Sequence, residues 1–426
     1  MTVEHAAIAE LDLASHIRSG DTVLWGQACA EPVSLTEALV RQRSGLGGVR
    51  CFLGIPSTDT LRPEHADHLS FVSYSAAGAN RALYQAGVLD VLPCHYSELP
   101  RVLSEGPLRA DVVMLSLPPA GPGGRFGLGL CADYVAAVID RARVVIAEVN
   151  EQVPEIAGCR ALSRDEIDVI VHTSRPPPEH PAAPPKDVEA AIAARVADLV
   201  QDGTTLQFGV GGLPSAVLPR LKDRRDLGVH SGMISDALIG LVEAGAVTGA
   251  RKSLDQGLII TGFLLGTRAL FEHAAANPAV QLRDTRYTHD AGVLAAQHRL
   301  VAVNTATEVD LTGQVNTETV GDRYVGAVGG AADFLRGAAR STGGVPVVAL
   351  PSTAGSSSRI VARLSGPVTV ARSDAGVIVT EHGIADLRGL TLPQRQQRML
   401  AIADPGHRST LESALSTGAR RRQERP

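Results

Sequence analysis

The stretch DLVQDGTTLQFGVGGLPSAVLPRL, residues 198–221, repeats the pattern of HIRSGDTVLWGQACAEPVSLTEAL, residues 16–39. Both pass from a helix end through a glycine turn into a short apolar strand. A loop with glycine and proline then leads into a helix. Short Val, Ile and Leu runs between helices are typical of parallel strands buried on both faces. The pattern therefore predicts an α/β fold.

Later stretches of the two halves also match in the same order. DVVMLSL at residues 111–117 is similar to LVAVNT at 300–305, and RVVIAEV at 143–149 is similar to VPVVALP at 345–351. Two unrelated α/β domains could both contain such short apolar runs, but the matched order of the runs favours a duplication. We expect two related open α/β domains.

A proline-rich segment separates these halves. Residues 174–187 read SRPPPEHPAAPPKD, with six prolines among fourteen residues. Proline fixes φ and lacks an amide donor, so the segment cannot form a regular helix or a central strand. The predicted organisation is a first domain over residues 1–173, a semi-rigid linker over 174–187 and a second domain over 188–426.

Composition excludes several functional classes. The 426 residues carry a formal net charge of -5, and only 3% of them are aromatic. These values argue against a broad nucleic-acid or anionic-membrane surface. No apolar run reaches the length of a membrane span, and the N-terminus lacks a signal-peptide pattern, so we expect a soluble cytoplasmic protein. The five cysteines form no C-x-x-C pair, and no residue set has the spacing of a metal site.

Three glycine- or serine-rich loops lie in the second half. They read GVGGLP at residues 209–214, GAVGGAADF at 326–334 and PSTAGSSSR at 351–359. Tight turns and solvated loops are the alternative explanation. Glycine loops can present free amides to an anion or oxyanion, and short hydroxyls followed by arginine suit phosphate or carboxylate. Together the loops favour a small-molecule site for acyl or phosphate groups.

Longer motifs resemble one family. In the first half they are SGDTV at 19–23, PCHYSELP at 93–100 and VIAEVN at 145–150. In the second half they include MISD at 233–236, NTATEVDLTGQV at 304–315 and VTEHGIADLRG at 379–389. The chain resembles the acetyl-CoA hydrolase/transferase family, which includes 4-hydroxybutyrate and succinyl-CoA:acetate CoA-transferases. The resemblance implies two linked open α/β domains of the CoA-transferase (NagB/RpiA-like) type, an active site at their junction and a homodimer. It also implies coenzyme A or acyl-CoA as substrate, with no permanently bound cofactor.

The resemblance also assigns roles to particular residues. The family's oxyanion donors fall on Val210, with Gly211 beside it, and on Gly330, and a glutamate that shapes the site falls on Glu381. Contacts to coenzyme A are expected at Gly209, Gly212, Gly329, Ser352, Thr353, Ser357 and Arg359.

Two positions depart from the family pattern. Family members attack the acyl-CoA with a glutamate, yet in HSGMISD, residues 230–236, the glutamate position is Gly232. Glycine can supply neither a nucleophile nor a base. A family asparagine aligns with His289 in THDA, residues 288–291, so two active-site positions differ together.

Three explanations compete. In the first, water or another nucleophile attacks the thioester directly, with His289 or His230 as general base. In the second, a substitute nucleophile keeps conventional CoA transfer, the candidates being Glu243, Glu308, Glu318 and Cys29. In the third, the protein binds acyl-CoA without catalysis or acts as a scaffold. The retained oxyanion positions favour an enzyme that hydrolyses acyl-CoA or transfers the acyl group to a non-carboxylate acceptor.

Overall fold

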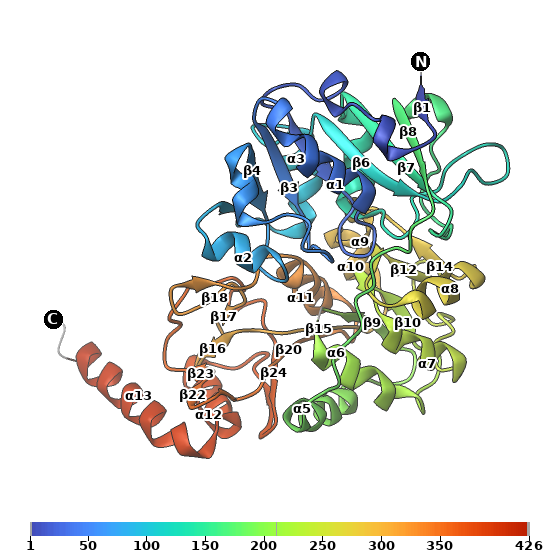
Figure 1. Cartoon of the computed structure of the whole chain (residues 1–426). Helices are drawn as coiled ribbons and strands as arrows, with labels where there is room; N and C mark the ends of the chain where they lie inside the picture. The colour runs from blue at the N-terminus through green and yellow to red at the C-terminus, as the bar shows by residue number, and fades with distance from the viewer. Residues whose placement is uncertain (1, 210, 424–426) are drawn as a thin grey trace.

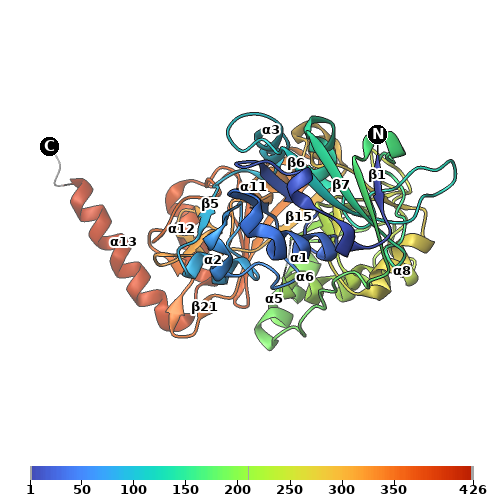
Figure 2. The ribbon, with the colours of Figure 1, turned by 45° about the horizontal axis from the view of Figure 1, so that its top comes forward.

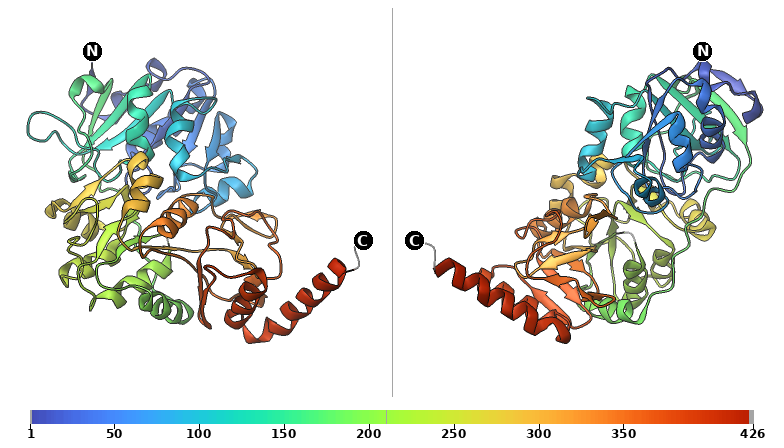
Figure 3. Two further views of the ribbon diagram at one scale, coloured as in Figure 1. Left: turned by 180° about the vertical axis from the view of Figure 1, so that it is seen from behind. Right: turned by 60° about the vertical axis from the view of Figure 1, so that its left-hand side comes forward.

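The computed structural model describes residues 2–209 and 211–423, with side chains up to residue 415. Two α/β domains lie against each other (Figure 1). Helix α13 (Arg408–Gln423) projects away from the second domain in every view (Figures 1–3). In the described part of the chain, no helix is both long and apolar enough to cross a membrane.

The first domain is built on a fully parallel eight-stranded sheet. From edge to edge its strands are β1 (Val3–His5), β8 (Val169–Thr173), β7 (Val144–Asn150), β6 (Val112–Leu117), β2 (Thr22–Trp25), β3 (Val49–Leu53), β4 (Leu69–Ser73) and β5 (Leu89–Val91). Its helices are α1 (Val33–Gln42), α2 (Asn80–Gln85), α3 (Leu99–Ser104) and α4 (Asp133–Val138). The central strands are buried along their whole length, as their continuous apolar runs predict.

The second domain repeats the order of seven of these strands and differs at one edge, where β25 (Gly383–Asp386) follows the other strands in the chain and β1 precedes them. Its sheet runs β14 (Val280–Leu282), β12 (Ile259–Thr261), β10 (Gly228–His230), β9 (Thr205–Phe208), β15 (Leu300–Asn304), β20 (Val345–Ala349), β24 (Val377–Thr380) and β25 (Gly383–Asp386). Only the last pair, β24 with β25, is antiparallel. The matched stretches form β2 and β9, β6 and β15, and β7 and β20, which occupy equivalent places. The predicted duplicated α/β architecture is confirmed.

The helices of the second domain are short, and two of them position the site. They are α5 (Asp187–Asp198), α6 (Gly212–Val217), α7 (Ile239–Glu243), α8 (Arg268–Ala276), α9 (Thr285–Thr288), α10 (Ala291–Ala296), α11 (Ala331–Arg340) and α12 (Leu392–Ile402). Helix α9 carries the chain into His289, and α11 begins directly after Gly330.

The two domains share one apolar core. The largest cluster of buried hydrophobic side chains extends from Leu24 in the first sheet to Val301 and Val379 in the second. Backbone hydrogen bonds also join the domains, including those from the Tyr96 amide to the Gly329 carbonyl (3.0 Å) and from the Ala132 amide to the Gly262 carbonyl (2.9 Å). Because the core is continuous, side chains from both domains can build one site.

The proline-rich segment runs along the outside of this junction (Figure 3). Residues 174–186 form neither helix nor strand, and α5 follows at once. The segment is held midway, because the His180 amide donates to the Gly266 carbonyl at 2.8 Å.

Candidate active site

A cavity of about 470 Å³ lies between the two domains, and we call it the junction cavity. From the first domain and the linker it is lined by Ile55, Tyr74, Ser75, Ala77, Gly78, Tyr96 and His180. From the second domain it is lined by Gln207–Gly209, Gly232, Met233, Phe263, His289, Asn304, Thr305, Thr317, Gly326–Ala331 and Phe334.

Sheet topology explains why the cavity lies there. After β9 the chain builds β10, β12 and β14 on one side and then crosses to β15 on the other. The crevice between β9 and β15 is therefore the point where strand order reverses, and ligands bind outside the carboxyl ends of strands at such points. Gln207, Gly209 and Asn304 lie there, at the ends of these two strands.

Gly232 lies in this cavity beside His289. A β-carbon built on Gly232 would lie 2.9 Å from His289 Cε1 and 3.2 Å from Nε2. The imidazole thus fills the space that a side chain at position 232 would enter. A β-carbon on Gly330 would also meet this ring, 2.7 Å from Nε2 and 3.0 Å from Cδ2. Gly232 and Gly330 therefore both leave room for the same imidazole ring.

Aromatic contacts hold the His289 ring in place. Its centroid lies 4.8 Å from that of Tyr96, with the planes inclined by 32°, and 4.6 Å from that of Phe334. Tyr96 belongs to the first domain and Phe334 to α11. The ring is therefore clamped between the domains and is 5% exposed.

The Thr288 hydroxyl bears on the tautomer of His289. It lies 3.3 Å from the Asp284 carbonyl, to which it can donate, and 2.9 Å from His289 Nδ1. If its hydrogen goes to the carbonyl, Nδ1 carries the ring proton and Nε2 has a lone pair beside Gly232 and Gly330. If its hydrogen goes to Nδ1, Nε2 carries the ring proton. Burial lowers the pKa of His289 to about 3, with His230 as a smaller cause, so the ring is neutral near pH 7.

His230 is placed differently. It is fully buried and is not among the residues that line the junction cavity. Its Nε2 donates to the Thr288 carbonyl at 3.1 Å, and its Nδ1 lies 3.3 Å from Gln297 Nε2. Burial and the nearby Lys252 charge lower its pKa to about 4. His230 thus supports the turn that carries His289, and its geometry does not favour the general-base role that the sequence left open.

Two of the glycine loops reach the cavity. Gly330 caps α11, and Gly329, Gly330 and Ala331 line the wall, so the N-terminal amides of this helix face the cavity. Such amides favour negative charge. Gly209 also lines the cavity, whereas Gly211 caps α6 with φ 126°, a conformation that favours glycine. Gly212 follows as the first residue of α6, and Val210 lies outside the described residues.

The third loop lies apart from the cavity lining. Thr353 and Ser357 belong to a small hairpin of β21 (Thr353–Ala354) and β22 (Ser357–Ser358). Glu381 accepts bonds from the Ser352 amide (2.8 Å) and hydroxyl (2.7 Å), so it braces the start of this loop. The Arg359 guanidinium donates to the carbonyls of Thr307 (2.7 Å) and Ala306 (2.5 Å). The guanidinium donors of Arg359 are therefore bonded to backbone carbonyls in this structure. No residue of this loop lines the junction cavity.

The four candidates for a substitute nucleophile all lie outside the lining of the junction cavity. Glu308 accepts from the Ser365 amide at 2.8 Å, and Glu318 accepts from Thr369 at 2.6 Å. Glu243 is exposed at the end of α7. Cys29 is buried, and this burial raises its thiol pKa to about 11, so it is not a thiolate near pH 7. None of the four lines the junction cavity.

Sequence reasoning missed a buried network behind Tyr96. Gln27 Nε2 donates to Asp133 Oδ2 at 2.6 Å, and the Tyr96 hydroxyl donates to the same oxygen at 3.0 Å. Gln27 Oε1 accepts from the Ile55 amide (3.0 Å) and from the Tyr74 hydroxyl (2.8 Å). Burial raises the pKa of Asp133. These residues lie far apart in sequence, and only the motif around Tyr96 gave any signal of them.

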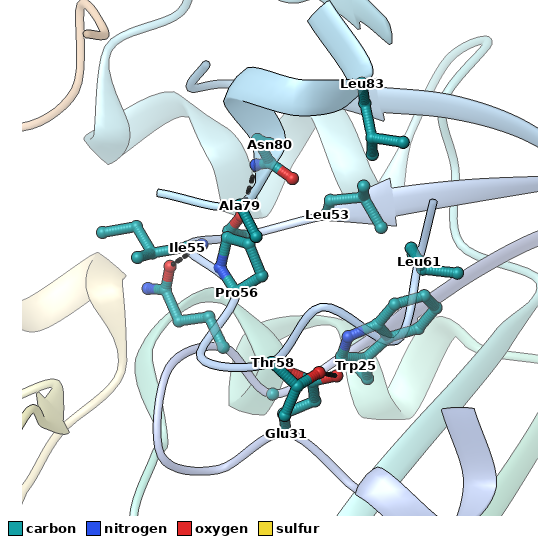
Figure 4. Close-up of a pocket in the computed structure, with 13 residues that line it drawn as sticks. Trp25, Glu31, Leu53, Ile55, Pro56, Thr58, Leu61, Ala79, Asn80 and Leu83 are labelled. Carbon is teal, nitrogen blue, oxygen red and sulfur yellow. Dashed lines mark hydrogen bonds between the residues drawn. The ribbon is translucent and has the colours of Figure 1, made fainter. Parts of the chain in front are cut away.

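A smaller hollow lies within the first domain (Figure 4). Its volume is about 20 Å³, and its walls include Trp25, Leu53 and Leu83. At one end Glu31 accepts from the Thr58 hydroxyl at 2.6 Å. This hollow has room for about one water molecule and is not a substrate site.

The fold and the cavity define a two-domain α/β protein with a ligand crevice at the domain junction. Models of the acetyl-CoA hydrolase/transferase N-terminal and C-terminal domains match residues 4–177 and 266–415. The chain belongs to the acetyl-CoA hydrolase/transferase family.

Individual relatives carry several activities. The chain is 35% identical to a 4-hydroxybutyrate coenzyme A transferase of Clostridium kluyveri, over 93% of this chain and 94% of that one. It is 24% identical to an acetyl-CoA hydrolase of Neurospora crassa, over 68% of this chain and 62% of that one. The crystal structure of RipA from Yersinia pestis is similar with a TM-score of 0.90 and 33% identity, over 97% of both chains.

Proposed function

We propose that this protein is an acyl-CoA-processing enzyme in which a non-covalent nucleophile attacks the thioester directly. The reaction is hydrolysis, or acyl transfer or cyclisation onto a non-carboxylate acceptor. One observation carries the proposal. Among the described residues, no Asp or Glu lines the junction cavity, and the His289 ring fills the space beside Gly232.

The proposed mechanism uses the thioester carbonyl of the substrate, the Gly330 amide and the Nε2 atom of His289. The thioester carbonyl lies against the N-terminus of α11, where the Gly330 amide stabilises the oxyanion, with Gly211 and Val210 as proposed partners. Water or another acceptor is held by the Nε2 lone pair of His289 and attacks the carbonyl carbon. Its proton passes to Nε2, and the thiolate of coenzyme A then leaves and takes a proton.

The low pKa of His289 is compatible with this role. An imidazole with a pKa of about 3 is a weak base in the free enzyme. During attack, however, the imidazolium forms in the same step as the oxyanion a few ångströms away. In a site screened from water, this opposite charge favours proton uptake by the ring.

Coenzyme A and its thioesters enter as substrates, and we propose no permanently bound cofactor. Gly209, Gly212 and Gly329 are the proposed contacts at the cavity, with Ser352, Thr353, Ser357 and Arg359 farther along the coenzyme A chain. We further propose a cytoplasmic homodimer, as the family resemblance implies. Conventional transfer to a carboxylate, and acyl-CoA binding without turnover, remain the competing functions.

A covalent-trapping experiment tests the proposal. Wild-type protein is incubated with a panel of acyl-CoAs, reduced with borohydride and analysed by intact mass. We expect no glutamate reduced to its alcohol, which is what borohydride makes of a glutamyl-CoA thioester as coenzyme A is released, and we expect free acid, or an ester, amide or ring, without added carboxylate. Such a reduced glutamate at any residue would overturn the direct mechanism. Binding without turnover would support the binder instead.

A further inference from the structure

The junction cavity lacks charged side chains that could match a carboxylate. Within the described residues, its lining contains no Lys, Arg, Asp or Glu. His289 is neutral near pH 7 because burial lowers its pKa to about 3. Any charged group that entered would therefore lose hydration without gaining a counterion from these walls.

The floor of the cavity carries a pair of neutral amides. The Asn304 side-chain nitrogen donates to Gln207 Oε1 at 3.0 Å, and both residues are buried. This bond leaves the Gln207 amide nitrogen and the Asn304 amide oxygen without a partner among the described residues. The pair thus offers one neutral donor and one neutral acceptor, side by side, at the point where strand order reverses.

Apolar groups form much of the remaining wall. Phe208 and Met233 come from the second domain beside the amide pair, and Ile55 faces them from the first. A chain of methylene groups gains favourable burial against these side chains. A terminal carboxylate at the same depth meets apolar carbon or the neutral amide pair.

We propose that the junction cavity selects acyl groups without charge, bound as CoA thioesters, and rejects those that end in a carboxylate. Gln207 and Asn304 are the residues that set this specificity, together with the apolar wall. The inference rests on the proposed function, because it assumes that acyl-CoA binds in this cavity.

Two features of the described lining could work against this selection, namely the amides at the N-terminus of α11, which the thioester oxyanion occupies in the proposed mechanism, and His180. This histidine comes from the proline-rich linker, its side chain is exposed, and it lines the cavity at the domain junction. Histidine is the residue type that can gain positive charge near neutral pH. If it reached an acyl carboxylate, it would serve as the missing counterion.

Calorimetry with free coenzyme A, butyryl-CoA and succinyl-CoA tests the inference without relying on turnover. The two acyl chains have equal length and differ in the terminal carboxylate. We expect succinyl-CoA to bind about 10²-fold more weakly than butyryl-CoA. Equal or tighter binding of succinyl-CoA would overturn the inference and leave the proposed function intact. No binding of any of the three would overturn the proposed function, and the inference with it.

Two variants test which residues cause the preference for butyryl-CoA over succinyl-CoA. Met233→Lys places an ammonium in the apolar wall and should shift the affinity ratio toward succinyl-CoA by about 10-fold or more. Retained butyryl-CoA binding shows that this variant is folded. His180→Gln should leave the wild-type ratio unchanged. If His180→Gln instead abolishes measurable succinyl-CoA binding, His180 is a counterion and the selection is overturned.

Discussion

The two sheets share the order of seven strands but use their central crevices in opposite ways. In the second domain, the carboxyl ends of β9 and β15 open into a cavity of about 470 Å³. In the first domain, the crevice beyond β2 is filled by the Gln27 side chain and its partners, with a hollow of about 20 Å³ beside it. The two similar sheets thus form two crevices, and hydrogen-bonded side chains fill the one in the first domain.

The filled crevice supports the open one. Its network ends at Tyr96, whose ring lies against His289. The first domain therefore contributes a rigid backing for the His289 ring beside Gly232. We propose that one half supplies support and the other the chemistry, and the following variants test this division.

Replacing His289 should have the largest effect. His289→Phe keeps a ring between Tyr96 and Phe334 but removes the Nε2 lone pair. We expect turnover, followed as release of the CoA thiol, to fall by about 10²–10⁴-fold. Butyryl-CoA affinity should change little. The matched control is His68→Phe, an exposed histidine of the first domain. Turnover that survives His289→Phe would remove this residue from the mechanism.

Restoring the family pair should have the next largest effect. Gly232→Glu alone places a β-carbon 2.9 Å from His289 Cε1, so the ring must move and the glutamate is misplaced. The double variant Gly232→Glu/His289→Asn removes this clash. We expect acid-dependent CoA exchange about 10²-fold higher in the double than in the single variant, because misplacement of ~1 Å can cost that much. Equal exchange in both would show that the two positions are not coupled.

Sequence patterns were sufficient for the architecture. The matched runs at residues 111–117 and 300–305 predicted equivalent strands because a fully buried strand needs a continuous apolar run wherever it occurs. That Gly232 stands at the family's glutamate position stays a prediction from one motif. The sequence did not show that the His289 ring lies in the space beside Gly232.

Contacts between distant residues could not be predicted from spacing. Tyr96 and His289 lie in different domains, and Gln27 meets Asp133 only after both α/β units have folded. Arg359 shows the same limit. Its serine-rich context predicts phosphate or carboxylate binding but not the Thr307 and Ala306 carbonyls to which its guanidinium donates in the fold. Local composition shows which hydrogen-bonding side chains a segment carries. It does not show which residues of the folded chain those side chains contact.

Removing the Tyr96 hydroxyl should have a moderate effect. Tyr96→Phe keeps the stack on His289 but deprives Asp133 and Gln27 of a partner. We expect kcat to fall about 10-fold with KM nearly unchanged, and the protein to lose about 1–3 kcal/mol of stability. Tyr84→Phe, in the same domain but not lining the cavity, should alter neither quantity. If kcat is unchanged in Tyr96→Phe while stability falls, the network is structural only.

The pH profile should show the smallest change. The ring of His289 has a pKa of about 3 in the folded protein, so it stays unprotonated as the pH falls from 7 to 5. Plots of kcat/KM report the free enzyme. We therefore expect kcat/KM to vary less than about 2-fold over this range, whereas a base with an ordinary histidine pKa would lose about 30-fold.

Stability changes must be separated from this result. The folded pKa values of His230 and His289, about 4 and about 3, lie below the value of about 6.5 expected when unfolded. The unfolded chain binds more protons in that window, so these residues make the protein less stable as the pH falls below 6.5. Burial raises the pKa of Glu148 to about 7, which acts in the opposite direction between about pH 7 and 4.5. Activity should therefore be measured well below the melting temperature at each pH. A 30-fold fall in kcat/KM in folded protein would show that the catalytic base is not the buried ring of His289.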